Sequence, residues 1–267
     1  MSQQASLYQQ VRSDLARLRL GATAEALPGA LEEAKAQQLS HTAFLARLLR
    51  TEVEAADQRR LNGLLRFASL PAPWTLEDFD FDAQPGVDRA LIRDLATLRF
   101  VEEHGNALFI GPPGVGKTHL SIALARKAVE AGYRTYYTTA ADLAARCHRA
   151  ALEGRWERVM RHYGNPSLLV VDELGYLPLA AEASSALFQV ITRRYLKGSI
   201  ILTTNRGIAS WGQIFDDPMV AAAILDRLLH KSTVIQIEGE SYRMRAHRAR
   251  AEALRQAVTA TPTESLL

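Results

Sequence analysis

The amino-acid sequence predicts an α/β protein, with a parallel sheet flanked by helices and a small helical domain in front of it. Three observations support this class. From residue 107 onward, apolar runs of strand length alternate with helical patterns, which is typical of a parallel sheet. A glycine-rich loop at residues 111–118 follows the first such run and precedes a helix. Before residue 70 the chain is leucine-rich at helical spacing.

The composition is that of a globular protein. Of the 267 residues, 48% are hydrophobic and 23% are charged, which is close to the average for soluble domains. The first residues are polar and lack the apolar core of a signal peptide, and no apolar run approaches the roughly 18 residues of a membrane span. We therefore expect a cytoplasmic protein without a membrane association. The formal net charge of +3 permits a nucleic-acid partner without requiring one.

Residues 1–70 are expected to form an N-terminal bundle of three or four short helices. Ser40 is placed to cap one of them, and the helix after it carries an apolar stripe of Leu45, Leu48, Leu49 and Val53. A further helical stretch ends near Ala68. Two prolines within residues 70–73 then break the helix and indicate a linker to a second domain, residues 71–267.

The second domain alternates between strands and helices. The expected strands are residues 107–110, 134–138, 168–171, 199–203 and 233–237. The expected helices are residues 118–131, 140–162 with a break near Gly154, 182–196 and 219–230. A strand–helix unit separates the glycine-rich loop from the strand at 168–171, as expected when an extra strand lies between those two strands in the sheet. A last helix, residues 242–258, is too short to form a separate helical lid.

The loop at residues 111–118 reads Gly-Pro-Pro-Gly-Val-Gly-Lys-Thr, which matches the phosphate-binding loop of ATPases and GTPases. Its glycines let backbone N–H groups turn toward phosphate oxygens. The helix that follows points its positive end at the same site. A glycine-rich turn before a surface helix is the simpler alternative, but strand, loop and helix all fit the binding site. The expected nucleotide-binding residues are Gly111, Pro112, Pro113, Gly114, Val115, Gly116, Lys117, Thr118 and His119.

Two acidic residues end the strand at 168–171. Asp172 and Glu173 lie at its carboxyl end, where open α/β sheets bind ligands. We expect Asp172 to hold Mg²⁺ together with the Thr118 hydroxyl, and Glu173 to polarise an attacking water. The alternative for Glu173 is a structural role in the loop before Gly175. A switch GTPase would not need this carboxylate, and the chain has no guanine-reading N-K-x-D segment, so we expect ATP.

Two further positions have a structural and a functional interpretation. Asn205 follows the strand at 199–203 and could orient the water with its amide, or simply end the strand. Phe79 and Phe81 lie in the stretch that leads into the second domain. Their rings could stack on adenine or pack in the core, and the sequence favours neither.

Seven segments together resemble the IstB family, the ATP-binding helper proteins of bacterial transposons, which are related to the helicase loader DnaC within the AAA+ class. They are LSHTAFLARLLRTE, TLEDFDFDAQPGVD, GPPGVGKTHL, AGYRTYYTTAADL, LLVVDELGYLPL, ILTTNRGIASWGQIFDD and AAAILDRLLHKSTVIQIEGESYRMR. The resemblance covers nearly the whole chain. It implies an AAA+ ATPase domain at residues 71–267, with residues 1–70 serving DNA binding, partner binding or self-assembly. It also implies a homo-oligomer that assembles with ATP on double-stranded DNA and recruits or activates a partner transposase.

The resemblance also assigns roles by position. Lys117 and Thr118 match the Walker-A residues, Asp172 and Glu173 the Walker-B pair, and Asn205 the sensor-1 residue. Arg227 falls at the arginine finger, which one subunit inserts into its neighbour's site; a surface salt bridge is the alternative. Arg243 falls at a sensor-2 arginine, although the absence of a full lid leaves that role open.

DNA contacts are expected from clusters of arginines, each of which could equally be a solvated face. The clusters are Arg47, Arg50, Arg59 and Arg60; Arg146, Arg149, Arg155, Arg158 and Arg161; and Arg243, Arg245, Arg248 and Arg250. The alternative function is a DnaC-like replicative helicase loader, which uses the same nucleotide-binding core. A nucleotide binder without hydrolysis is a third possibility, although every charged residue that hydrolysis requires is present.

Overall fold

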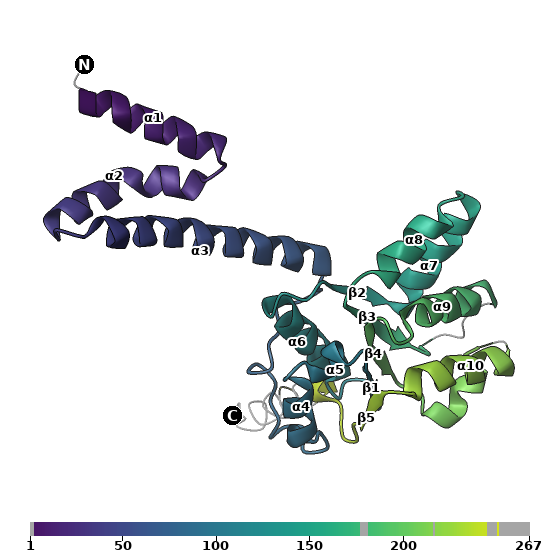
Figure 1. Cartoon of the computed structure of the whole chain (residues 1–267). Helices are drawn as coiled ribbons and strands as arrows, with labels where there is room; N and C mark the ends of the chain where they lie inside the picture. Colours follow the sequence, from purple (N-terminus) through teal and green to yellow (C-terminus); the bar gives the residue numbers. More distant parts are fainter. Residues whose placement is uncertain (1–2, 177–180, 216, 245–249, 251–267) are drawn as a thin grey trace, which may run out of the picture. The chain divides into compact units, whose positions relative to one another are not determined.

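The structure is a computed structural model that describes residues 3–176, 181–215, 217–244 and 250 (Figure 1). The chain divides into two compact units, Met1–Gly63 and Leu64–Leu267. The first unit is helical and the second contains all five strands that the described residues form. The long helix α3, His41–Ala68, runs through the boundary between them.

The first unit consists of α1 (Gln3–Arg17), α2 (Gly21–Ala36) and most of α3. The N-cap expected at Ser40 is confirmed, because its hydroxyl accepts a hydrogen bond from the Ala43 N–H at 3.2 Å. The expectation of two separate helices between residue 40 and Ala68 is wrong. No proline interrupts this stretch, and α3 continues through the Asn62-Gly63 pair over 28 residues.

The second unit is built on one parallel sheet with the strand order β2-β3-β4-β1-β5. The strands are β1 (Asn106–Ile110), β2 (Thr135–Thr139), β3 (Leu168–Leu174), β4 (Ser199–Thr204) and β5 (Ser232–Gln236). Strand β4 lies between β1 and β3, so the extra strand expected between the two motif-bearing strands is confirmed.

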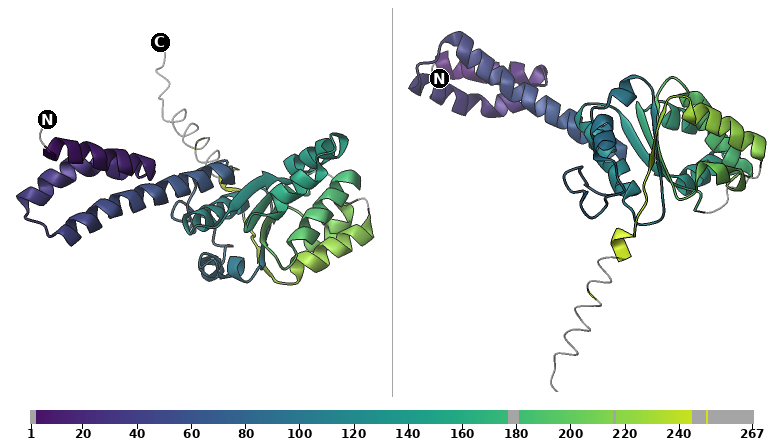
Figure 2. Two further views of the ribbon diagram at one scale, coloured as in Figure 1. Left: turned by 45° about the horizontal axis from the view of Figure 1, so that its top comes forward. Right: turned by 90° about the horizontal axis from the view of Figure 1, so that it is seen from below.

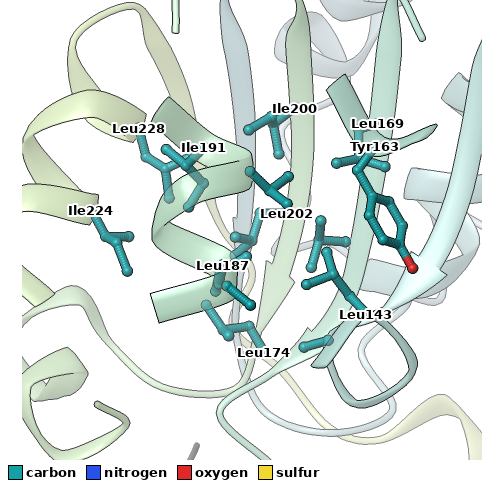
Figure 3. Close-up of a cluster of buried hydrophobic side chains, with 14 of the residues drawn as sticks. Leu143, Tyr163, Leu169, Leu174, Leu187, Ile191, Ile200, Leu202, Ile224 and Leu228 are labelled. Atoms are coloured by element: carbon teal, nitrogen blue, oxygen red, sulfur yellow. The ribbon is translucent and has the colours of Figure 1, made fainter. Parts of the chain in front are cut away.

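Helices cover both faces of this sheet (Figures 1 and 2). One face carries α4 (Arg89–Leu95), α5 (Arg99–Glu102) and α6 (Lys117–Glu130). The other carries α7 (Ala140–Leu152), α8 (Trp156–Gly164), α9 (Ala181–Arg194), the 3-10 helix η1 (Ile208–Gln213) and α10 (Pro218–Leu229). Side chains alternate along each strand, so Phe109 packs on the α6 side and Leu108 on the opposite side. Figure 3 shows the hydrophobic cluster on the side of α7 to α10, in which Leu187 and Ile191 of α9 pack near Leu202 of β4.

A buried arginine ties several loops to this core. Arg194, at the end of α9, is fully buried. Its guanidinium donates to the carbonyls of Tyr163 at 2.8 Å, Pro166 at 2.9 Å and Ser199 at 2.6 Å. Because Arg has five N–H donors in a fixed plane, one side chain can satisfy carbonyls that the start of β3 and β4 would otherwise leave unpaired.

The sequence predicted the regular elements of this unit well. All five strands are confirmed, and the break in the helix at 140–162 falls between α7 and α8, where Gly154 has a φ of +66°. The short α4 and α5 and the 3-10 helix η1 were not predicted. The expected helix at 242–258 lies mostly outside the described residues. Among the residues that the structure describes, no helical lid follows β5.

Candidate functional site

A cavity of about 590 Å³ lies at the carboxyl ends of β1, β3 and β4. It is lined by residues 113–119 of the glycine-rich loop and α6, and by Glu173, Tyr176 and residues 203–205 from the strand ends. The segment before α4 contributes Pro73, Trp74, Asp78, Phe79, Asp80 and Gln84, and the segment after β5 contributes Tyr242 and Arg243. Five separate parts of the chain therefore meet at one site.

The glycine-rich loop adopts a conformation that requires its glycines. Gly114 and Gly116 have φ angles of +84° and +97°, in the left-handed region. A Cβ at Gly116 would lie 2.5 Å from the Phe79 ring, and one at Gly114 would lie 2.1 Å from the Ser241 hydroxyl. The loop thus has no room for side chains at these two positions, while the Val115 side chain is buried in the core below.

Lys117 is held inside the loop. Only 8% of the residue is exposed, and its ammonium donates to the carbonyls of Gly111 at 2.8 Å and Pro112 at 2.9 Å. Burial lowers the pKa of Lys117 and the charge of Arg243 lowers it further, while Asp172 opposes both. The loop therefore concentrates positive charge at the bottom of the cavity, as phosphate binding requires.

Asp172 is buried at the end of β3, next to the loop. Its Oδ1 atom accepts a hydrogen bond from the Thr118 hydroxyl at 3.2 Å and another from the Thr203 hydroxyl. Its Oδ2 atom accepts from the Tyr137 phenol at 2.7 Å. The expected pairing of Thr118 with Asp172 is thus present in the geometry, and it brings together the hydroxyl and carboxylate oxygens that Mg²⁺ prefers.

Glu173 lies where the regularity of β3 breaks. The register with β4 shifts between Val171 and Leu174, and Glu173 has a φ of +64°. A bulge re-aims the side chain beside it, and a non-glycine residue in this region stores strain of about 1–3 kcal/mol. As a result, Glu173 is exposed and lines the cavity, whereas its neighbour Asp172 is buried.

Asn205 lines the cavity directly after β4. Its side-chain Oδ1 atom is buried and has no hydrogen-bond partner among the described residues. An unpaired buried acceptor costs about 1–3 kcal/mol, so native structures rarely keep one without a role. The position fits an amide that pairs with a molecule bound in the cavity.

The chain after β5 crosses the glycine-rich loop. The Ile237 N–H donates to the Ile110 carbonyl at 2.8 Å, and the Tyr242 N–H donates to the Gly114 carbonyl at 3.0 Å. Gln84 holds the same segment from the other side, donating to the Glu240 carbonyl at 3.2 Å. These contacts bring Arg243 to the cavity.

Arg227 does not line the cavity. It lies half-buried on α10, where its guanidinium donates to the Ala223 carbonyl at 2.9 Å and its Cζ lies 5.0 Å from the centre of the Phe188 ring. No carboxylate of the described residues forms an ion pair with it. The salt bridge considered as its alternative role is therefore not found in this part of the chain.

Aromatic side chains form one side of the cavity. His119 of α6 stacks on Trp74 with ring centroids 4.9 Å apart and planes 9° from parallel, and Phe79 meets His119 edge-on at 5.3 Å. Phe79 both lines the cavity and packs in the core, whereas Phe81 packs beside it and does not line the cavity. Trp74 was missed because its flanking prolines indicated only a linker.

The arginine clusters differ in their partners. Arg47 forms an ion pair with Glu33, and Arg59 forms one with Glu52 at 2.7 Å. Both positive charges are therefore neutralised by carboxylates of the first unit. The α7–α8 cluster is exposed throughout, and Arg149 and Arg158 have no ion-pair partner among the described residues. Arg245 and Arg248 lie outside the described residues.

Known proteins are similar to this chain along most of its length. The family described as IstB-like ATP-binding protein matches residues 13–251. The chain is 44% identical over 236 residues to the protein of Geobacillus stearothermophilus named as the ATP-binding protein of insertion sequence IS5376, covering 88% of this chain and 94% of that protein. It is 45% identical over 234 residues to the corresponding IS21 protein of Pseudomonas aeruginosa, covering 88% of each.

Solved structures share the fold. AMPPCP-bound DnaA from Aquifex aeolicus matches with a TM-score of 0.55 at 20% identity, over 69% of this chain and 56% of that one. DnaI matches with a TM-score of 0.54 at 18% identity, over 62% of this chain and 91% of that one. Both likenesses support the P-loop α/β architecture. No helix in the described part of the chain is long and apolar enough to cross a membrane.

Proposed function

Because the chain belongs to the family of IstB-like ATP-binding proteins, we propose that it is a Mg²⁺-dependent ATPase that assembles on double-stranded DNA and recruits or activates a partner transposase. The observation that carries the enzymatic part is one cavity that collects Lys117, Thr118, Glu173 and Asn205, with Asp172 directly below. An ammonium, a metal-binding pair and a carboxylate for water are the parts that phosphoryl transfer requires.

The loop and Lys117 bind the phosphates in this proposal. Backbone N–H groups at the start of α6 and the Lys117 ammonium supply positive charge from the floor of the cavity. Thr118 and Asp172 would hold Mg²⁺, which neutralises phosphate charge when bound. Arg243 adds a cation from the segment after β5, which supports the sensor-2 role although no helical lid follows β5 within the described residues.

Hydrolysis rests on Glu173 and Asn205. Glu173 is an exposed carboxylate at the end of β3 and forms no ion pair within the described residues, so it can accept a proton from water directly. The Asn205 amide lies on the neighbouring strand and offers an unpaired oxygen that can orient the same water. The strained backbone at Glu173 supports a functional role over a purely structural one.

The base of the nucleotide is proposed to lie on the aromatic side of the cavity. The stacked pair of Trp74 and His119, together with Phe79, forms an aromatic wall next to the loop. Stacking of a base on such rings contributes about 1–3 kcal/mol. The sequence left stacking or core packing open for Phe79 and Phe81, and it did not indicate Trp74.

Arg227 is proposed to act on a second subunit. Its guanidinium lies outside the cavity of its own chain and keeps most of its N–H donors free of the described side-chain carboxylates. A planar cation inserted by a neighbour would stabilise the charge that develops on the γ-phosphate. The active form in this proposal is therefore a homo-oligomer.

DNA is proposed to contact the exposed arginines of α7 and α8. Unlike Arg47 and Arg59, Arg149 and Arg158 are not neutralised by carboxylates in the described structure. With a net charge of only +3, one subunit should bind DNA weakly. Assembly with ATP would multiply the phosphate contacts along the duplex and make binding cooperative.

A DnaC-like helicase loader uses the same cavity and remains the second candidate. The likeness to DnaI concerns the fold alone, whereas the relatives at 44% and 45% identity are named for insertion sequences. We therefore favour the role in transposition. The two functions differ in their partner, a transposase in one case and a ring helicase in the other.

A gel-shift titration on duplex DNA tests the assembly. We expect cooperative, sequence-tolerant binding with ATP and weaker binding with ADP, and log K should fall by about 0.9 per neutralised phosphate for each decade of salt. Replacing Arg149 and Arg158 together by Ala should weaken binding, whereas the same change at the exposed Arg93 and Arg99 should not. Equal, non-cooperative binding in all nucleotide states would favour the loader. Hydrolysis without any DNA binding would contradict the transposition role.

A further inference from the structure

The carboxylate of Asp172 is held by hydroxyl groups from both neighbouring strands. Strand β3 lies between β2 and β4, and each of these strands directs one hydroxyl at Asp172. The Tyr137 phenol of β2 donates to Oδ2 at 2.7 Å, and the Thr203 hydroxyl of β4 donates to Oδ1. The two oxygens of the carboxylate are thus fixed separately, which sets the plane of the group.

The position of Tyr137 follows from the register of the sheet. Tyr137 pairs with Val170, two residues before Asp172, so the two side chains lie on the same face of the sheet. A carboxylate only accepts hydrogen bonds, whereas a phenol carries one O–H donor, so Tyr137 is the donor in this contact.

Thr203 links the two acidic residues. While its hydroxyl donates to Asp172, its oxygen accepts a hydrogen bond from the Glu173 N–H at 2.9 Å. This bond holds the backbone of Glu173 in the left-handed conformation that turns its side chain into the cavity. A single hydroxyl thus couples the orientation of one carboxylate to the backbone of the next.

We propose that Tyr137 and Thr203 are positioning residues that orient the Asp172 carboxylate toward Mg²⁺-bound nucleotide. This inference rests on the proposed ATPase function. Asp172 is 1% exposed, so without these two donors its charge would keep only the Thr118 hydroxyl, 3.2 Å from Oδ1, as a partner that replaces water. The carboxylate would also be freer to rotate, because the hydrogen bond from Tyr137 is the one that holds its Oδ2 atom among the described residues. Partners that orient a metal ligand typically change metal affinity about 10–100-fold when removed.

The test measures how Mg²⁺ promotes binding of a fluorescent ATP analogue, so that its readout is independent of turnover. For Tyr137→Phe and Thr203→Val we expect the Mg²⁺ concentration at half-maximal effect to rise about tenfold or more. Binding of the analogue in excess EDTA should stay at the parental level, because the loop and Lys117 are unchanged. Thr203→Ser keeps the hydroxyl and should restore the parental Mg²⁺ dependence.

Tyr133→Phe is the matched control. Tyr133 also donates its phenol to a carboxylate, that of Glu102 at 3.0 Å, but away from the cavity, so this variant should behave as the parent. Thermal unfolding measures whether each variant is folded. If Thr203→Val does not fold, the Mg²⁺ dependence of Tyr137→Phe is compared with that of Tyr133→Phe, and this comparison tests the inference. An unchanged Mg²⁺ dependence in folded Tyr137→Phe overturns the inference. Failure of the parental chain to bind ATP overturns the proposed function instead.

Discussion

Lys117 and Glu173 line the same cavity but differ in their exposure to solvent. Lys117 is buried and donates hydrogen bonds to two loop carbonyls, whereas Glu173 is exposed at a strained position of β3. Binding of phosphates needs a fixed positive charge, while acceptance of a proton needs a carboxylate that water can reach. Burial therefore assigns the two side chains to different steps.

Substitution at these positions should separate binding from turnover. Lys117→Ala should abolish tight ATP binding, because the loop amides alone leave the phosphate charge poorly neutralised. Glu173→Gln should bind ATP like the parent but hydrolyse it at least about 100-fold more slowly, since an amide does not accept the proton. Filter binding with labelled ATP and a phosphate-release assay measure the two steps.

Glu103→Gln is the control for this pair, because Glu103 is exposed and does not line the cavity. It should leave both binding and turnover unchanged. Hydrolysis by Glu173→Gln at the parental rate would show that another group activates the water.

At the level of elements, the sequence predicted what depends on local pattern. The apolar run at 168–171 and the loop at 111–118 fixed the type and order of β3, β1 and α6. It did not predict that Trp74 stacks on His119 or that the segment after β5 crosses the loop, because both depend on contacts between distant parts of the chain. The bulge at Glu173 likewise has no local glycine or proline signal in front of it.

The edge strand β2 and α8 meet in an aromatic cluster around His162. The ring lies 4.3 Å from that of Tyr136 and 5.9 Å from that of Phe67, measured between centroids. Its Nε2 lies 3.1 Å from a guanidinium nitrogen of Arg146 and can accept from it only when neutral. Burial, Arg146 and Arg134 lower the pKa of His162 to about 4.

This cluster should make stability depend on pH. The pKa of His162 in the folded protein lies below the ordinary value, so the unfolded chain binds more protons between pH 6.5 and about 4, and stability falls as the pH falls through that window. We expect a loss of about 1 kcal/mol, because the ring is half-exposed and solvent weakens the effect. Urea unfolding at pH 7 and pH 4.5 measures it.

His162→Gln should abolish this part of the pH dependence. The same change at His148, which is exposed on α7, should leave the pH dependence as in the parent. An identical loss of stability in the parent and in His162→Gln would assign the effect to other groups.

At the scale of the whole molecule, one of the proposed catalytic residues, Arg227, lies outside the cavity of its own chain. The cavity contains Lys117, Glu173, Asn205 and Arg243, whereas Arg227 lies on α10 beside Phe188. A residue placed in this way can serve a second subunit or its own helix. Only mixing of subunits distinguishes the two.

Arg227→Ala should bind ATP normally but lose assembly-dependent turnover by a factor on the order of 10³, as when arginine fingers are removed. Mixed with Lys117→Ala protein, it should regain part of the activity, because each variant supplies what the other lacks at a shared interface. The phosphate-release rate of the mixture, compared with that of each variant alone, is the measurement. Absence of recovery in variants that co-assemble would show that Arg227 acts only within its own chain.

The stacked pair of Trp74 and His119 also gives the protein a natural optical reporter. The chain has three tryptophans. Trp211 is fully buried and Trp156 bonds to Gln189 at 3.2 Å, so Trp74 is the one whose indole borders the cavity. Because indole emission responds to the polarity and stacking of its surroundings, occupancy of the cavity should be visible as a change in intrinsic fluorescence. Trp74→Phe should silence that signal, so that nucleotide exchange can be followed in real time without an attached dye.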